Sequence, residues 1–387
     1  MRAGSSGASP CARHPSSVMA VVQDSVEPIR SVLDERHESL SAKWSNFGGW
    51  RMPLEYAAGG VTAEHTAVRD GVGIFDVSHL GTAVVRGPGA IDGLNAVLTN
   101  DLQRIAAGRA QYSLLCADDG GVIDDLIVYV MSADEALIIP NAANAAEVLR
   151  LLRAQLPADV EVEDLHQERA IIAVQGPLSP QVLAAMDLPH EMAYMAWARS
   201  GDMLVCRTGY TGEVGFEIVL PRQDAPALWD RLLSVDLGQG QRPVPCGLAA
   251  RDTLRTEMGY PLHGQDISPQ ISPVEAGLSW AIGWNKPTFV GRSALIQQRD
   301  AGPRRQLVGL LAVERAIPRH AMTVLDNADS TIGVVTSGTF SPTLQRGIAL
   351  ALVTSETAVG DQVRVDVRGR HLAFEVVTPP FVSASPR

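Results

Sequence analysis

The 387-residue chain has few cysteines and no cysteine pair of the kind that binds zinc. Its four cysteines, Cys11, Cys116, Cys206 and Cys246, form no C-x-x-C motif, and their spacing fits no zinc site. So low a cysteine content in so long a chain also argues against a disulfide scaffold. We therefore expect reduced, mostly buried thiols in a reducing compartment.

The chain also lacks a long apolar run and an excess of positive charge. No segment approaches the roughly 20 apolar residues that span a bilayer as a helix. The formal net charge is −11, whereas nucleic acids and anionic membrane surfaces attract clustered positive charge. The sequence therefore predicts a protein that binds neither nucleic acid nor membranes.

Lysine is scarce: it occurs only at Lys43 and Lys286, against 30 arginines. Such a bias is typical of GC-rich coding and favours a bacterial origin. The first 23 residues contain no acidic residue, which is typical of a transit peptide, or of an over-long start with Met19 as the true initiator. We favour a disordered or spurious extension over residues 1–22 and a cytoplasmic bacterial protein, with the mitochondrial matrix as the alternative.

Helix and strand signals do not alternate one for one, which favours an antiparallel α+β fold over a doubly wound parallel sheet. Apolar spacing and end signals predict helices over residues 29–44, 62–69, 88–98, 144–156, 226–233 and 247–258, and one that begins at Ser179. Strands are predicted over residues 82–86, 122–130, 137–140, 170–175, 204–207 and 216–220.

The C-terminal third changes character at a boundary near Ile267, where Ser, Pro and Gln cluster. From about Leu307 onward strand signals are frequent and helix signals are scarce. Apolar and polar residues alternate over 363–368, and Gly369-Arg370 then turns the chain into a further strand. This region is predicted to be a small antiparallel barrel or sandwich.

Two adjacent carboxylates, Asp124 and Asp125, lie within a segment that otherwise has the pattern of a buried strand. Neighbouring side chains of a strand point to opposite faces, so we expect that the two cannot share one site. One should face an aqueous or hydrogen-bonded edge, and the other should point with Ile127 and Tyr129. A buried carboxylate is costly without partners, so this stretch predicts a ligand or a polar network.

The run 207–217 holds three glycines at every third position and ends at Glu217. It is not a Walker A loop, because no Lys-Ser/Thr follows, and it lacks the dinucleotide-binding spacing. It could form a glycine-rich hairpin with Glu217 exposed. Alternatively, Tyr210 and Glu217 could lie in a pocket, where a carboxylate can accept two hydrogen bonds from a guanidine-like edge such as that of a pterin.

Arg251 and Arg255 lie four residues apart on a predicted helix and so share one face. Arg255 could pair locally with Asp252, or both arginines could meet an anionic ligand or a buried acid. His79 lies in Phe75-Asp-Val-Ser-His79 and suggests a Ser–His–Asp triad. Triad members come from separate elements, however, so a structural role is favoured for His79.

Taken together, these segments resemble the T-protein family of the glycine cleavage system, the aminomethyltransferases. Nine segments match in the family's order across residues 45 to 381. They are residues 47–54, 75–79, 98–101, 120–125, 141–144, 175–177, 207–217, 247–252 and 336–342.

The resemblance implies three domains in a cloverleaf around a central folate channel, built from antiparallel sheets with flanking helices. The implied domains are a discontinuous first domain over residues 23–78 and 167–268, a second over 79–166, and a C-terminal β-barrel over 269–387. The implied enzyme (EC 2.1.2.10) takes the aminomethyl group from the lipoyl arm of the H-protein. It gives the one-carbon unit to tetrahydrofolate and releases ammonia, with no metal.

The resemblance also assigns site residues. It makes Asp125 the essential aspartate and Asp124 a structural neighbour, Glu217 the pterin-binding glutamate, and Arg251 a folate contact. The remaining lining falls on Tyr112, Tyr129, Asn141, Tyr194 and Tyr210. Some family members have a C-terminal tyrosine that helps to close the folate site, but residues 379–383 offer none, which puts the tail's share in binding in doubt.

Two other functions stay open. One is another folate-dependent demethylase of the same fold, although an oxidase would carry a flavin-binding signature that is absent here. The other is a non-enzymatic folate-binding protein of the iron–sulfur assembly type. Such proteins carry a Lys-Gly-Cys motif, which residues 245–249 lack.

Overall fold

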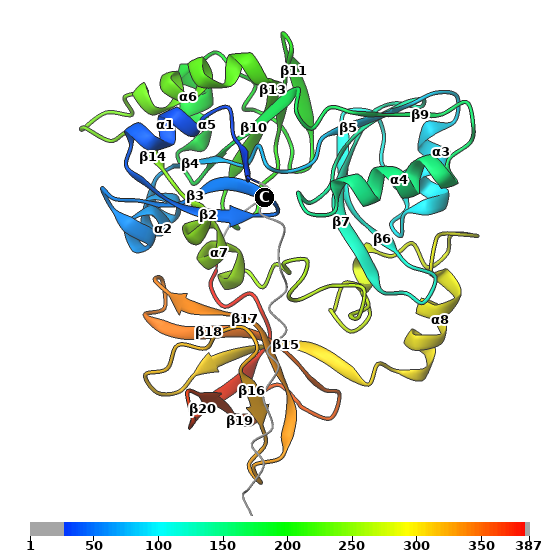
Figure 1. Ribbon diagram of the computed structural model, residues 1–387, viewed down its shortest axis with the longest axis vertical. Helices are drawn as coiled ribbons and strands as arrows, with labels where there is room; N and C mark the ends of the chain where they lie inside the picture. Colours follow the sequence, from blue (N-terminus) through cyan, green and yellow to red (C-terminus); the bar gives the residue numbers. More distant parts are fainter. Residues whose placement is uncertain (1–26, 384–387) are drawn as a thin grey trace, which may run out of the picture.

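The computed structural model describes residues 27–383, so Cys11 and the predicted N-terminal extension lie outside the described residues. Three lobes surround helix α7 and the loops beside it (Figure 1). The α+β class and the C-terminal barrel are confirmed. Cys116, Cys206 and Cys246 are buried free thiols, as expected.

The first lobe is assembled from segments that lie far apart in the sequence. Its six-stranded sheet runs β11 (Trp197–Ser200), β12 (Met203–Cys206), β13 (Gly215–Pro221), β10 (Arg169–Gln175), β4 (Gly73–Asp76) and β14 (Val244–Pro245). A smaller sheet joins β1 (Ile29–Arg30), β3 (Trp50–Tyr56) and β2 (Ala42–Phe47). The helices here are α1 (Asp34–Ser39), α2 (Gly60–Asp70), α5 (Ser179–Ala185), α6 (Ala225–Ser234) and α7 (Leu248–Glu257). Trp229 and Phe216 are fully buried in its core.

The second lobe holds one antiparallel sheet backed by two helices. The sheet runs β6 (Arg109–Cys116), β7 (Val122–Ser132), β8 (Glu135–Ile139), β5 (Ala83–Arg86) and β9 (Glu161–Asp164). Helices α3 (Ala90–Val97) and α4 (Ala145–Gln155) contribute apolar residues to its core, as the spacing of Leu94, Val148 and Leu152 predicts. Strand β7, the longest here, carries the two aspartates.

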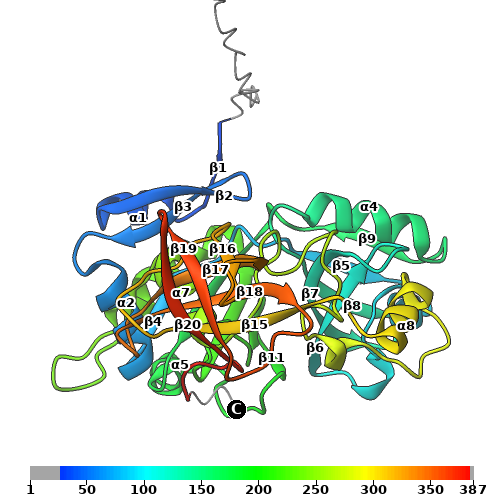
Figure 2. The same cartoon turned by 90° about the horizontal axis from the view of Figure 1, so that it is seen from below.

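The third lobe is a closed antiparallel barrel. Its strands are β15 (Arg305–Ala312), β18 (Arg346–Thr354), β17 (Thr331–Ser341), β16 (Thr323–Leu325), β19 (Gln362–Val367) and β20 (Arg370–Val377), and β20 pairs back onto β15. Figure 2 shows helix α8 (Arg292–Ala301) apart from the barrel, against the second lobe. Leu295 of α8 packs in the same buried cluster as Cys116 and Val122 of that lobe.

The helix predicted over residues 29–44 is wrong. Residues 29–30 form a short strand, α1 has six residues, and residues 42–56 form the β2–β3 hairpin, which turns at Gly48 and Gly49 in positive-φ conformations. Helix α8 and strands β4, β6, β9, β11 and β14 were not predicted either.

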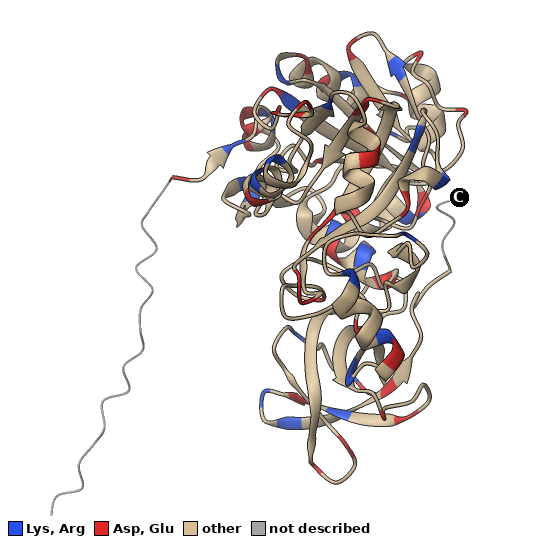
Figure 3. Cartoon of the chain, turned by 90° about the vertical axis from the view of Figure 1, so that its right-hand side faces the viewer, with Lys and Arg blue, Asp and Glu red and all other residues tan. Residues whose placement is uncertain are grey.

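Charge is distributed over all three lobes, with basic and acidic residues interspersed (Figure 3). Among residues 27–383 no helix is long and apolar enough to cross a membrane.

Candidate active site

A cavity of about 1280 Å³ is lined by residues of all three lobes. Phe47 of the β2–β3 hairpin, Ile139 of the second lobe and Phe340 of the barrel contribute apolar surface to it. The structure brings all eight predicted site residues to this cavity, namely Tyr112, Asp125, Tyr129, Asn141, Tyr194, Tyr210, Glu217 and Arg251.

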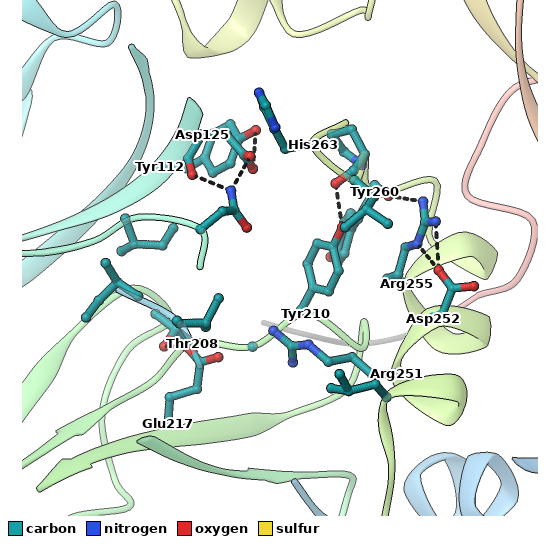
Figure 4. Close-up of a pocket in the computed structure, with 18 of the residues that line it drawn as sticks. Tyr112, Asp125, Thr208, Tyr210, Glu217, Arg251, Asp252, Arg255, Tyr260 and His263 are labelled. Atoms are coloured by element: carbon teal, nitrogen blue, oxygen red, sulfur yellow. Dashed lines mark hydrogen bonds and ion pairs between the residues drawn. The ribbon is translucent and has the colours of Figure 1, made fainter. Parts of the chain in front are cut away.

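Asp125 projects from β7 on the same face as Ile127 and Tyr129, and all three line the cavity, as strand alternation predicts. The Tyr112 hydroxyl donates to Oδ2 of Asp125 at 3.1 Å (Figure 4), and Nδ2 of Asn141 donates to Oδ1 at 2.8 Å. Desolvation raises the pKa of Asp125, while nearby His263 and the two donors oppose that rise. The carboxylate is therefore held by two hydrogen bonds inside the cavity wall.

Asp124 corrects one expectation, because it reaches the same partner as Asp125. Its Oδ1 accepts from Nδ2 of Asn141 at 2.9 Å, and its Oδ2 accepts from the Asn141 backbone N–H at 3.0 Å. The two aspartates thus share one amide although their side chains leave opposite faces of β7. Burial, and then the charge of Asp125, raise the pKa of Asp124.

The network continues beyond Asp124 to a histidine that was not predicted. Nδ2 of Asn144 donates to Oδ1 of Asp124 at 2.6 Å and lies 3.0 Å from Nδ1 of His263. Nε2 of His263 lies 3.1 Å from the carbonyl oxygen of Val122. These contacts hold the imidazole between a side-chain amide and a backbone carbonyl oxygen. Asn144 precedes α4 as expected, yet its side chain makes no capping bond.

Glu217 lies on β13, and its side chain faces the cavity rather than open solvent. Of the alternatives for residues 207–217, the structure therefore favours the pocket. The Thr208 hydroxyl donates to Oε2 of Glu217 at 2.6 Å. The Tyr129 hydroxyl lies 3.2 Å from the same Thr208 oxygen.

The glycines of this run serve close packing. A Cβ at Gly209 or Gly215 would lie 2.0 or 2.3 Å from atoms of the Gln175 side chain. That side chain donates to the carbonyl oxygens of Thr208 and Phe216 and accepts from the Thr211 hydroxyl. Gln175 therefore fixes the loop that carries Thr208 and Tyr210.

Arg251 and Tyr210 form another part of the wall. The guanidinium carbon of Arg251 lies 4.9 Å from the centre of the Tyr210 ring, an attractive cation–π geometry. Nη1 of Arg251 is buried and has no hydrogen-bond partner among the described residues. The Tyr210 hydroxyl donates to the Pro261 carbonyl oxygen, and the ring, which lines the cavity, also stacks on Tyr260 with ring centres 5.8 Å apart. Arg251 can thus offer a charged donor to an anionic or carbonyl group.

Arg255 pairs both with its helix neighbour Asp252 and with a buried acid, the two possibilities that the sequence left open. It lies 2.7 Å from Asp252 and 2.8 Å from the buried Asp266, and it donates to Ser337 of the barrel at 2.8 Å. Arg255 therefore joins α7 to the barrel.

The order and content of these segments agree with known proteins. Residues 33–286 match the model of the GCVT N-terminal domain, and residues 305–383 match that of the glycine cleavage T-protein C-terminal barrel domain. The chain belongs to the glycine cleavage T-protein family. An aminomethyltransferase of Parafrankia is 58% identical over 92% of this chain and 99% of its own length, and one of Mycobacterium bovis is 51% identical over 95% of this chain and all of its own.

A solved structure supports the same membership. Aminomethyltransferase T of the glycine cleavage system from Bartonella henselae is 37% identical and covers 92% of this chain and 98% of its own, with a TM-score of 0.87. The T-protein architecture therefore extends over nearly the whole chain.

The Ser–His–Asp triad that the sequence of this T-protein suggested around His79 does not form. Asp76 accepts from the Ser78 backbone N–H and pairs instead with His37 at 2.9 Å. His79 is 2% exposed and lines the cavity, and its Nδ1 has no partner among the described residues. Desolvation, then the charge of Arg251, lower the pKa of His79 to about 3, so its imidazole is neutral at physiological pH.

Among the lining residues that the sequence did not predict are Thr208, His263 and Trp280. Trp280 stacks on Tyr112 with ring centres 5.4 Å apart and is 62% exposed. An isolated tryptophan gives no periodic signal, and His263 lies in an irregular loop. Thr208 lies inside the glycine run and could have been flagged there. The tail residues 379–383 do not line this cavity.

Proposed function

We propose that this chain is the aminomethyltransferase of the glycine cleavage system (EC 2.1.2.10). It moves the one-carbon unit of an aminomethyl group on the lipoyl arm of the H-protein to tetrahydrofolate. The products are 5,10-methylenetetrahydrofolate, ammonia and the dihydrolipoyl H-protein. The observation that carries the proposal is the convergence of Asp125, Glu217 and Arg251 on one cavity in a chain of the T-protein family.

The residues of the cavity fit tetrahydrofolate. The Glu217 carboxylate can accept paired N–H groups from the 2-amino-4-oxo edge of a pterin. The unpartnered Nη1 of Arg251 can donate to a carbonyl or carboxylate oxygen, and Tyr210 lines the same cavity. Tetrahydrofolate supplies the nitrogen nucleophile that accepts the carbon, and the protein supplies orientation.

Asp125 is proposed to be the residue that faces the reacting nitrogens. Its carboxylate can accept a proton or hold an N–H group in place, because Tyr112 and Asn141 fix both of its oxygens. Transfer between two bound carriers depends on positioning more than on strong acid–base chemistry. The apolar lining from Phe47, Ile139 and Phe340 limits the access of water to the reactive carbon.

The H-protein partner and a bacterial cytoplasmic location belong to the same proposal. The relatives from Parafrankia and Mycobacterium bovis are bacterial aminomethyltransferases. No metal ion is part of the proposed reaction.

The direct test is an assay with aminomethylated H-protein and tetrahydrofolate, in which methylenetetrahydrofolate and ammonia are measured. We expect turnover for the wild type and a loss of at least a hundredfold in kcat for Asp125→Asn, typical of a lost acid–base group. The variant should keep its thermal stability and folate affinity. Near-normal turnover by Asp125→Asn would remove that residue from the mechanism, and an inactive wild type would contradict the function.

A further inference from the structure

The Glu217 carboxylate depends on one neighbour for its orientation. Among residues 27–383, the hydrogen bond given to it comes from the Thr208 hydroxyl, at 2.6 Å to Oε2. Oε1 accepts no bond within the described residues and is not among the fully buried unpaired atoms. The hydrogen bond from Thr208 to Oε2 therefore orients the carboxylate. Oε1 remains available to accept a hydrogen bond from a ligand in the cavity.

The direction of the hydrogen bonds follows from the groups themselves. A carboxylate can only accept, so the single hydroxyl proton of Thr208 goes to Glu217. The Tyr129 hydroxyl, 3.2 Å from the Thr208 oxygen, must then be the donor to it. The result is a chain in which Tyr129 donates to Thr208 and Thr208 donates to Glu217. Bonds in such a chain polarise and strengthen one another.

The two hydrogen bonds that link Tyr129, Thr208 and Glu217 are shielded from water, and the backbone that carries Thr208 is held in place. Thr208 is 4% exposed and Tyr129 is 1% exposed, so water does not compete for these bonds. Threonine is β-branched and has restricted side-chain rotation, and the Thr208 carbonyl oxygen accepts from Gln175 at 3.2 Å. Thr208 can therefore hold Glu217 in one orientation.

The same two hydrogen bonds connect two lobes of the protein. Tyr129 lies on β7 four residues after Asp125 and on the same face, whereas Glu217 lies on β13 of the first lobe. We propose that Thr208, supported by the Tyr129 hydroxyl, is a positioning residue that fixes Glu217 relative to Asp125 for recognition of the pterin edge. This inference rests on the proposed function, and it assigns Tyr129 a role in orientation in addition to lining the cavity.

The first test is equilibrium binding of 5-formyltetrahydrofolate, measured by calorimetry. Thr208→Val keeps the shape and removes the hydroxyl, and we expect its dissociation constant to rise about tenfold, typical of a lost buried bond to a charged group. Thr208→Ser should restore most of the affinity, and Tyr129→Phe should weaken binding to a smaller extent. Thr336→Val is the matched control, because it removes a buried threonine hydroxyl that bonds Leu350 inside the barrel, and it should leave binding unchanged.

A second ligand separates positioning from general damage. A folate analogue without the 2-amino group should bind the wild type much more weakly than 5-formyltetrahydrofolate does, and this difference should shrink in Thr208→Val. Wild-type affinity in Thr208→Val, or an undiminished difference between the ligands, would overturn the inference. A wild type that binds no folate would instead contradict the proposed function. If Thr208→Val does not fold, Tyr129→Phe gives the comparison instead, and wild-type affinity in Tyr129→Phe would remove the proposed support.

Discussion

Asp124 lies where a charged carboxylate is costly. It is fully buried, and desolvation followed by the charge of Asp125 raises its pKa from 3.8 to about 8. A group whose pKa is higher in the folded protein stabilises the fold below its unfolded pKa, and this stability is lost as the pH rises through the folded pKa. For Asp124 the loss therefore falls between pH 3.8 and about pH 8.

Asp124→Asn should reveal this loss. The amide cannot ionise, so the variant does not lose stability as the pH rises from 3.8 to about 8. At about pH 5, where the Asp124 carboxyl group is protonated and neutral, the variant should be less stable than the wild type, because either carboxyl oxygen can accept the hydrogen bond from the Asn141 backbone N–H whereas an amide nitrogen cannot. The deficit in free energy of unfolding should shrink toward pH 8. Denaturant unfolding at three pH values measures it, and a constant or growing deficit would contradict the raised pKa.

Strand alternation predicted the neighbours of Asp125 but not those of Asp124. Alternation sets the direction of each Cβ, and it placed Asp125 with Ile127 and Tyr129 as observed. It does not predict which side chains lie beside a strand where its partner strand ends. Strand β8 pairs with β7 only from Ile127 onward, so Asn141, just past the end of β8, can reach both carboxylates. A contact of that kind depends on a strand end that the local pattern does not define.

At the scale of the element, β7 begins against another segment with no room for a side chain. A Cβ at Gly121 would lie 2.0 Å from the carbonyl oxygen of Pro269, which is backbone and cannot rotate away. Gly121→Ala should therefore displace the start of β7 and cost roughly 1–3 kcal/mol, the usual range for overpacking. Because Asp125 follows four residues later, turnover should fall as well.

Thermal unfolding measures the loss of stability in Gly121→Ala, and the aminomethyltransferase assay measures the loss of turnover. Gly59→Ala is a suitable control, because the added Cβ would meet only the methyl group of Ala63, at 3.0 Å. An unchanged melting temperature for Gly121→Ala would show that the Pro269 segment yields easily.

Other elements show where sequence patterns are sufficient. Helices α2, α3, α4, α6 and α7 were predicted within a few residues because each has an apolar face and end signals. The region from β1 to the start of β2 was predicted as one helix because apolar residues at 29, 32, 33, 40 and 44 also fit a helical face. The glycines at 48 and 49 were interpreted as a helix stop, whereas they form the hairpin turn.

At the scale of the molecule, local patterns predicted the barrel and the α+β class. They could not place three lobes around one cavity, because many of the residues that meet there lie far apart in the sequence. Asp125 and Glu217, for example, come from different sheets. Their convergence was expected only from the resemblance to the T-protein family.

The attachment of the barrel to the first lobe gives a prediction for the whole molecule. Glu257, at the end of α7, is fully buried and accepts from Arg69 of α2 at 2.8 Å. It also accepts from the hydroxyls of Ser341 and Thr343 of the barrel. Despite the opposing desolvation, hydrogen bonding and the charges of His65 and Arg69 lower its pKa from 4.5 to about 2.

A lowered carboxyl pKa stabilises the fold above the unfolded value, and this stability is lost as the pH falls through the folded value. For Glu257 the shift corresponds to about 3 kcal/mol, lost between pH 4.5 and about pH 2. Glu257→Gln cannot ionise, so it should be less stable than the wild type at pH 7, and the gap should narrow as the pH falls below 4.5. Denaturant unfolding across this range measures the gap, with Glu147→Gln as the control, because the fully exposed Glu147–Arg150 pair on α4 should contribute little. A gap that stays constant with pH would mean that the charge of Glu257 does not hold the barrel in place.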